Sequence, residues 1–220
     1  MRLIIATSSF PTHPKEAINA GVFVYAMADA IGKQGHTVSV FTPEKGEEIR
    51  GFDFEVKTFA WGGNQKVLTR LNPKNPQELF LLGRLMLNGR QSFAKFVRQF
   101  QPDGILAAWV IPSGFWAYGL NVPLAVWALG SDIWGVGRYP FGKFITKKVL
   151  RKADHVFANS FFLIDEIEKM AGKKAEFLAA SRNLPVDKIP PVQLDGKGPH
   201  FLFIGRWDKA KGPDILLEAM

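Results

Sequence analysis

The sequence predicts an α/β protein built on a Rossmann-like parallel sheet with helices on both faces. Two short runs, residues 3–6 and 37–41, are predicted as strands, and the first is apolar throughout, which is typical of a strand that is buried on both sides. An amphipathic helix predicted over residues 22–34 lies between these runs, and Gly35 with His36 marks its end. A strand, a helix and a second strand in this order form a right-handed unit with parallel strands. Repetition of this unit gives the predicted sheet.

The same alternation continues to residue 179. Further strands are predicted at residues 54–59, 102–109, 122–129, 155–158 and 176–179. Further helices are predicted at residues 76–100, after 112–114, over 138–152 and from an Asn159-Ser160 cap to Met170. Helical spacing predicts that Leu79 and Phe93 of the first of these helices, and Phe161 of the last, face the core.

Composition limits the classes of function. The 220 residues are 47% hydrophobic and 22% charged, so the chain can bury a core. The absence of cysteine excludes disulfides, thiol nucleophiles and zinc–thiolate sites. The first apolar run is too short for a signal peptide and no stretch is long enough to span a membrane. We therefore expect a cytoplasmic protein, with peripheral contact to a membrane surface as a further option.

The net charge of +8 indicates an anionic partner, and nucleic acid, acidic lipid head groups and nucleotide-sugar phosphates all qualify. The basic residues that form one stripe of the predicted helix are Arg138, Lys143, Lys147 and Arg151. The opposite side carries Phe144, Ile145 and Val149. Such a helix can lie on an anionic membrane or bind an acidic acceptor. A solvated cationic face that covers the sheet is the alternative.

Three side chains stand where predicted strands end. Trp109 follows one strand, and Ser131 with Asp132 follows the next. Because ligands of open parallel sheets bind outside the carboxyl ends of the strands, these residues are candidates for a cleft. An aspartate after a glycine turn is also typical of a helix cap, so both roles stay open for Asp132.

The last twenty residues predict an anion site. Residues 201–204 are predicted as a strand, and a helix is predicted from Pro213. Arg206 and Lys211 lie on the loop between them, beside the positive end of the helix dipole. Backbone donors, the dipole and two cations suit a phosphate or diphosphate. A solvated loop with two surface cations is the alternative.

Short motifs follow one another in a characteristic order along the chain. They are Thr7-Ser-Ser-Phe-Pro11, Gly21, Gly35-His36, Pro102-Asp103, Trp109-Val-Ile-Pro-Ser-Gly114, Gly130-Ser-Asp-Ile-Trp134, Ala153-Asp154, Asn159-Ser160 and Gly205-Arg-x-x-x-x-Lys-Gly212. With these motifs the chain resembles the retaining glycosyltransferases of family 4, the "glycosyl transferases group 1" type. That family has the GT-B fold, in which two Rossmann-like domains face each other across an active cleft.

The resemblance implies transfer of a sugar, with retention of configuration, from a nucleotide-sugar donor to a carbohydrate or lipid-linked acceptor. No cofactor and no metal are implied. Arg206 and Lys211 would hold the donor diphosphate, and Gly21 would let the first helix approach the same phosphates. The residues that would face the cleft from the acceptor side are Trp109, Ser131 and Asp132.

The chain departs from the family pattern at two positions. Ala108 and Leu129 stand where family members often carry histidine, and neither side chain can hydrogen-bond or move a proton. Catalytic residues are therefore left unassigned.

The resemblance also divides the chain. Residues 1–182 would form the Rossmann-like acceptor-side domain, 183–199 a linker, and 200–220 the first strand and helix start of a truncated donor-binding domain. We therefore expect the chain to be inactive alone. The alternative is a non-catalytic basic α/β module that binds an anionic acceptor, a membrane surface or a partner protein. No nucleic-acid motif accompanies the charge, so specific nucleic-acid binding is not expected.

Overall fold

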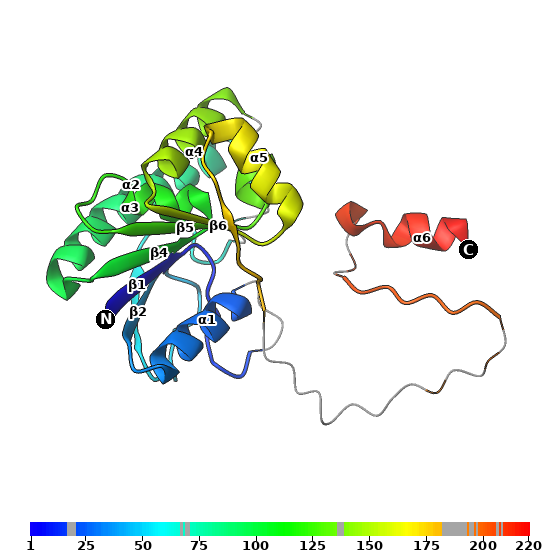
Figure 1. The fold of residues 1–220 in the computed structure, drawn as a ribbon, viewed down its shortest axis with the longest axis horizontal. Helices are drawn as coiled ribbons and strands as arrows, with labels where there is room; N and C mark the ends of the chain where they lie inside the picture. The colour runs from blue at the N-terminus through cyan, green and yellow to red at the C-terminus, as the bar shows by residue number, and fades with distance from the viewer. Residues whose placement is uncertain are drawn as a thin grey trace. The chain divides into compact units, whose positions relative to one another are not determined.

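The computed structural model describes residues 1–16, 21–66, 68, 71–135, 139–181, 193, 196, 198–205, 207 and 209–220. The chain divides into two compact units, Met1–Asn183 and Leu184–Met220 (Figure 1). The first unit holds a seven-stranded sheet in the order β3-β2-β1-β4-β5-β6-β7. All six strand pairs are parallel. The predicted fold class is therefore confirmed.

The strands are β1 (Arg2–Thr7), β2 (Thr37–Pro43), β3 (Glu55–Phe59), β4 (Gly104–Ala108), β5 (Leu124–Ala128), β6 (His155–Ala158) and β7 (Glu176–Phe177). The helices of the first unit are α1 (Val22–Lys33), α2 (Pro76–Phe100), α3 (Phe115–Ala117), α4 (Pro140–Lys152) and α5 (Phe161–Ala171). Two irregular turns, Val110–Gly114 and Ser131–Gly135, follow β4 and β5.

Side chains alternate across the sheet and so build two cores. Ile4 of β1 belongs to the core on one face, which also contains residues of α2, α3, α4 and α5. Its neighbour Ile5 packs with Val24 and Ala28 of α1 on the other. Figure 1 shows α1 on the opposite side of the sheet from α2, α3 and α4. Helices thus cover both faces, which suits the continuous apolar runs of the central strands.

Local sequence explains where the long helices begin and end. The Asn75 side chain accepts the Gln77 N–H at 3.0 Å, Pro76 occupies the first turn, and Gln101 closes α2 at φ 50°. The predicted Ser160 cap of α5 is confirmed, because its hydroxyl accepts the Leu163 N–H at 3.3 Å. Gly172, at φ 64°, ends that helix in the left-handed conformation that glycine adopts without strain.

Two apolar residues that were predicted to face inward are exposed, and so is Phe144 on the predicted apolar side of α4. Leu79 of α2 is 55% exposed, Phe144 of α4 is 56% exposed and Phe161 of α5 is 72% exposed. In α4 the buried residues are Gly142, Thr146, Val149 and Leu150. The small residues Gly142 and Thr146 therefore lie on the buried face of α4, and Phe144 lies on its exposed face. The prediction was wrong for Leu79 and Phe161, because helical spacing identifies an apolar side but not which of its residues reach the core.

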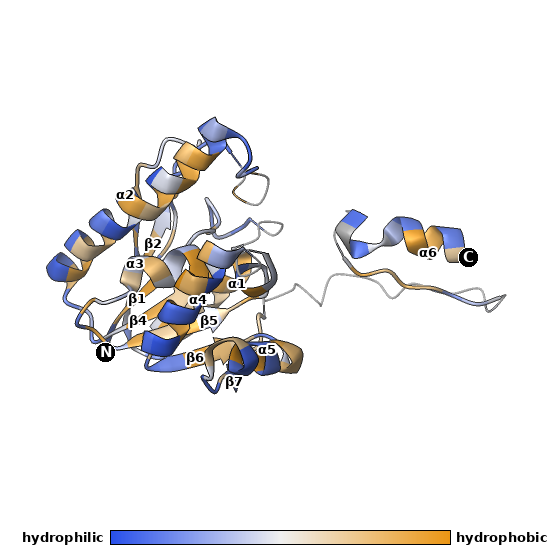
Figure 2. Cartoon of the chain, turned by 90° about the horizontal axis from the view of Figure 1, so that it is seen from above, coloured by the Kyte–Doolittle hydropathy of each residue, from blue (hydrophilic) through white to orange (hydrophobic). Residues whose placement is uncertain are grey.

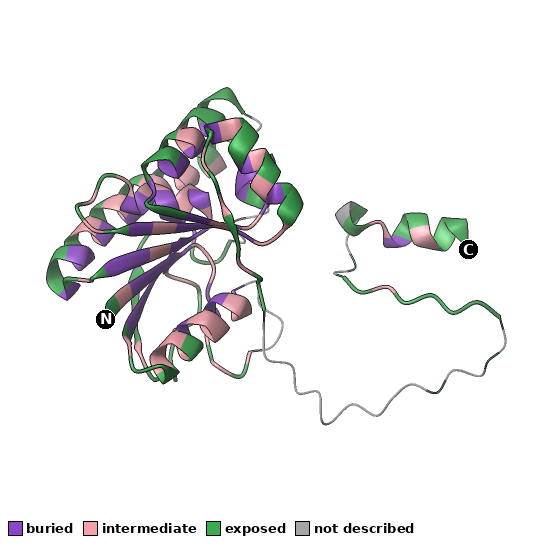
Figure 3. Ribbon diagram, viewed as in Figure 1, coloured by how far each residue is buried: buried purple, intermediate pink, exposed green. Residues whose placement is uncertain are grey.

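The second unit contains a turn at Lys209–Lys211 and the helix α6 (Pro213–Ala219), which confirms the helix predicted from Pro213. Residues 201–204 form no strand, contrary to the prediction. Strand geometry needs a hydrogen-bonded neighbour, and no sheet partner for them occurs among the described residues. Of the residues of this unit whose burial the structure describes, Pro213 is the one that is buried. Figure 3 shows much of this unit in green, which marks exposed residues.

Candidate functional site

The strand order reverses direction between β1 and β4. From β1 the chain adds β2 and β3 on one side, and from β4 it adds β5, β6 and β7 on the other. Thr7 at the end of β1 pairs with Ala108 at the end of β4, so the following loops diverge from one point. Such a switch point is where open α/β sheets bind ligands. The candidate site is therefore the carboxyl edge around Trp109.

Asp132 ties together the two loops that follow β4 and β5. Its Oδ2 accepts the N–H of Val110 at 2.7 Å, and its Oδ1 accepts the N–H of Leu129 at 3.3 Å. The side chain is 1% exposed. Burial raises the pKa of the Asp132 carboxyl, while these hydrogen bonds oppose that shift. Asp132 thus acts within the protein, where it fixes the position of its neighbours.

Trp109 is the half-buried residue that this arrangement holds in place. Its N–H donates to the carbonyl of Trp127 at 2.9 Å, and its carbonyl accepts the Gly114 N–H at 3.1 Å. Its φ of 72° lies in a region that side-chain-bearing residues avoid, at a cost of about 1–3 kcal/mol. Its ring packs edge-on against Phe23 of α1, with centroids 5.6 Å apart. Strain of this kind is common where a loop forms part of a binding site.

Gly21 lies at the same edge, directly before α1. Its φ of −98° is open to any residue, so its small size matters rather than its conformational freedom. A Cβ there would meet the backbone of Ser9 and Phe10, with the Cα of Phe10 only 2.6 Å away. Gly21 therefore lets the loop after β1 lie against the first turn of α1. The approach of donor phosphates to this turn stays a prediction.

The remaining predicted cleft positions differ in exposure. Ser131 is exposed on the turn after β5. Ala108 is fully buried beneath Trp109, and Leu129 is half-buried against the same core. The structure therefore brings Gly21, Trp109 and Asp132 to one edge, and leaves Ser131 the most accessible of the residues predicted on the acceptor side.

Lys45 is a candidate that the sequence analysis missed. It is half-buried, two residues after the carboxyl end of β2. Burial lowers the pKa of its ammonium, and Glu16 and Glu47 partly oppose that shift. A half-buried lysine with a perturbed pKa at this edge is a candidate for a functional residue. Its place just after a strand was the signal that could have identified it.

The side chains of the predicted cationic stripe differ in exposure and in their hydrogen bonds. Lys143 is exposed and Lys147 half-buried, whereas the Arg151 Nε donates to the carbonyl of Ala171 at 2.9 Å and ties α4 to α5. Arg138 lies outside the described residues. In the second unit Lys211 is exposed, and Arg206 also lies outside the described residues. The diphosphate site formed by Arg206 and Lys211 stays a prediction.

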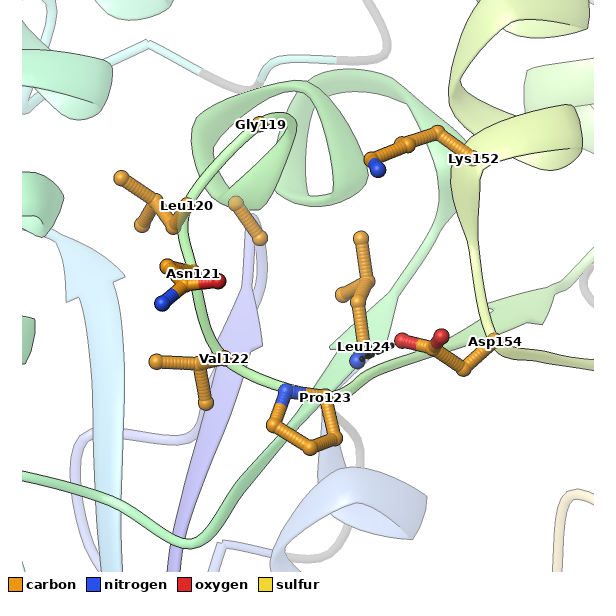
Figure 4. A pocket seen from close by; sticks show the side chains of 9 residues that line it. Gly119, Leu120, Asn121, Val122, Pro123, Leu124, Lys152 and Asp154 are labelled. Atoms are coloured by element: carbon orange, nitrogen blue, oxygen red, sulfur yellow. Dashed lines mark hydrogen bonds between the residues drawn. The ribbon is translucent and has the colours of Figure 1, made fainter.

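A hollow of about 260 Å³ lies at the opposite edge of the sheet. Figure 4 shows it between the segment 119–124, which leads into β5, and the side chains of Lys152 and Asp154. The Asp154 Oδ2 accepts the Leu124 N–H at 2.8 Å across it. Because Leu124 begins β5, this hollow is at the amino edge and belongs to no predicted site.

Two further observations concern the part of the chain that the structure describes. No group of three or more histidine, aspartate or glutamate side chains there could hold a metal ion. No helix within it has both the length and the hydropathy that a bilayer crossing requires.

Comparison with known families gives one match. Residues 20–177, well over half of the chain, match the family model described as Glycosyltransferase Family 4. No curated protein matches the sequence significantly.

Solved structures share the fold. Sucrose-phosphate synthase from Thermosynechococcus elongatus has a TM-score of 0.61 at 12% identity, over 81% of this chain and 47% of that chain. UDP-GlcNAc 2-epimerase from Neisseria meningitidis, bound to UDP-GlcNAc, has a TM-score of 0.53 at 12% sequence identity, over 81% of this chain and 46% of that chain. Os79 from O. sativa, in complex with UDP, has a TM-score of 0.50 at 14% sequence identity, over 79% of this chain and 51% of that chain. The chain thus spans about half the length of these proteins, and the likeness concerns the fold.

Proposed function

This chain belongs to Glycosyltransferase Family 4, and from that premise we propose that its first unit is the acceptor-side domain of a sugar-transferring enzyme. The enzyme would move a sugar from a nucleotide-sugar donor to a carbohydrate or lipid-linked acceptor, with retention of configuration. The observation that carries the proposal is the family match over residues 20–177. The two loops joined by Asp132 at the switch point support it, because that edge is where such folds bind ligands.

In this proposal each site residue has a distinct role. Trp109 and Ser131 contact the acceptor, and Asp132 positions Trp109 by holding the N–H of Val110. Gly21, Arg206 and Lys211 bind the donor diphosphate. Cations and helix dipoles would stabilise the diphosphate as it leaves, with neither metal nor cofactor.

We further propose that the 220 residues alone transfer no sugar. The second unit carries the proposed diphosphate residues, and Pro213 is its one buried residue among those the structure describes. A loop without a packed core cannot hold two cations in a fixed geometry. The test incubates the purified chain with labelled UDP-glucose, UDP-GlcNAc or GDP-mannose and a panel of sugar and lipid acceptors. Labelled product from the purified chain would contradict the proposal.

Acceptor binding provides an independent test. Saturation-transfer NMR should detect contact between the protein and an acceptor sugar, and Trp109→Ala should abolish the signal. Phe80→Ala is the matched control, because Phe80 is a 66% exposed aromatic residue on α2. A signal that survives Trp109→Ala would remove Trp109 from the acceptor site.

A non-catalytic module is the second candidate. It is favoured by Ala108 and Leu129, which supply no proton-transfer group at two positions that often hold histidine in the family. Expression of any coding sequence that continues beyond Met220 separates the candidates. Sugar transfer by the extended product supports the enzyme, and acceptor binding without transfer supports the module. For either candidate we propose a cytoplasmic location with contact to a membrane surface.

A further inference from the structure

The outer face of α4 exposes large aromatic side chains at its start. Phe141 is 75% exposed, Phe144 is 56% exposed, and Tyr139, which caps the helix, is 61% exposed. Gly142, Thr146 and Val149 fill the inner face, so these rings have no place in the core. Figure 2 shows apolar and polar residues side by side along this helix.

Cations surround the same rings. Lys143 and Lys148 are exposed and Lys147 is half-buried. The Lys148 Nζ lies 4.5 Å from the centroid of the Phe144 ring. Every charged residue of α4 is basic, and the sequence has no acidic residue between Asp132 and Asp154. The surface is therefore both apolar and positively charged.

The start of α4 lies near the candidate site. The helix connects the parallel strands β5 and β6, so it runs back along the sheet and begins at the carboxyl edge. It packs against both irregular turns, Val110–Gly114 and Ser131–Gly135. The exposed rings are thus on the same edge as Trp109.

We propose that the surface formed by Tyr139, Phe141, Phe144, Lys143, Lys147 and Lys148 docks on an anionic phospholipid membrane. Aromatic rings favour the interfacial region of a bilayer, and lysines beside them are attracted to lipid phosphates. A soluble polyanion would attract the lysines but would leave the rings without a partner. Docking by this surface presents the carboxyl edge to the lipid head groups, so the acceptor is carried by a lipid. This inference rests on the proposed function and specifies its acceptor.

The test is co-sedimentation of the 220-residue chain with vesicles of phosphatidylcholine alone or mixed with phosphatidylglycerol. We expect binding to the mixed vesicles that weakens as salt is added. Phe141→Ser with Phe144→Ser should lower the partition coefficient about tenfold or more, and Lys143→Gln with Lys147→Gln by a similar factor. The matched controls, Phe80→Ser and Lys95→Gln on α2, should leave it unchanged. Because all these side chains are at least partly exposed, thermal unfolding should show that each variant folds.

Three results would overturn the proposal. They are equal binding to neutral and anionic vesicles, full binding by the double phenylalanine variant, and an equal loss in the α2 controls. Full binding by the phenylalanine variant together with loss in the lysine variant would identify a polyanion surface instead. The vesicles contain neither sugar donor nor sugar acceptor, so the result of the co-sedimentation assay is independent of the sugar-transfer assay. Docking without any transfer by an extended product would therefore contradict the proposed enzyme and leave the membrane surface in place.

Discussion

Asp132 and Asp154 are carboxylates that each accept a hydrogen bond from a strand or loop N–H, and their surroundings make them unequal. Asp132 accepts from Val110 and Leu129 in a dry environment at 1% exposure. Asp154 accepts from Leu124 at 2.8 Å and is exposed. A buried N–H that loses its partner cannot turn to water, whereas an exposed one can. The geometry of the candidate site therefore depends on Asp132.

Replacement of Asp132 tests this dependence. Asp132→Ala should lower the free energy of unfolding by about 2–4 kcal/mol, because the buried N–H of Val110 and the partly buried N–H of Leu129 lose their acceptor. Asp154→Ala, the matched control, should lower it by less than about 1 kcal/mol, since water replaces the carboxylate. Urea denaturation followed by tryptophan fluorescence measures both. Equal losses would show that Asp132 is no more important to the fold than an exposed carboxylate.

The raised pKa of Asp132 also predicts a pH dependence. Burial raises this pKa in the folded state, so the native protein keeps the proton to a higher pH than the unfolded chain does. Between the ordinary and the raised value the native state binds more protons, and the free energy of unfolding therefore falls as the pH rises. The Asp132→Asn variant has an amide in place of the carboxyl group, and the amide does not titrate in this pH range. The stability advantage of the wild type over this variant should grow as the pH falls through that window; a constant difference would contradict the shift.

Among the elements, α2 shows how one small residue sets the packing of a helix. Gly89 lies against the Trp116 ring of α3, and a Cβ there would be 2.6 Å from Cε2 of that ring. The ring cannot move away easily, because it is fully buried and its Nε1 donates to the Leu85 carbonyl at 3.2 Å. Phe41 and Phe59 pack edge-on against it. The register of α2 on the sheet is therefore set where its backbone meets Trp116.

A pair of glycines on this helix tests that conclusion. Gly89→Ala should destabilise the protein by about 1–3 kcal/mol through overpacking against Trp116. Gly83→Ala, six residues earlier on the same helix, has no atom within 4 Å of the added methyl and should stabilise by about 0.5–1 kcal/mol. The direction of the shift in the urea midpoint shows whether each substitution stabilises or destabilises the protein. Stabilisation by both substitutions would mean that α2 does not approach Trp116 this closely.

For the whole molecule, the core belongs to the first unit. The buried apolar residues of both clusters run from Ile4 to Ala171. β7 is the edge strand beside β6, and the carbonyl of Leu178, just after β7, accepts the Trp127 Nε1–H at 3.0 Å. The first unit therefore contains all the parts of an independently folding domain.

Deletion tests this independence. A chain that ends at Asn183 should unfold at the same temperature as the 220-residue chain, because it keeps every residue of both clusters. A chain that ends at Gly172 should unfold at a lower temperature, since it loses β7 and the acceptor of the Trp127 indole. Differential scanning calorimetry measures both. A lower midpoint for the chain ending at Asn183 would show that the second unit contributes to the stability of the first.

The sequence by itself determined the fold class and much of the element order. Apolar runs such as residues 3–6 can be buried only in a sheet covered on both faces, and chain chirality then makes the connections right-handed. It also located Trp109, Ser131 and Asp132 at strand ends, since strand ends are marked by local turns such as the one at Gly130. These features are local, so the residues alone could predict them.

Tertiary structure decided what each of these side chains does. The sequence left a cap and a ligand role open for Asp132, and only the adjacency of β4 and β5 shows that its carboxylate reaches Val110. Periodicity placed Phe144, Ile145 and Val149 together on an apolar side of α4, whereas the folded chain buries Val149 with Gly142 and Thr146 and exposes Phe144. The strand predicted at residues 201–204 is absent because a strand needs a neighbour that no local sequence supplies. Contacts between residues distant in sequence depend on how elements pack, and that is why they became known only from the folded chain.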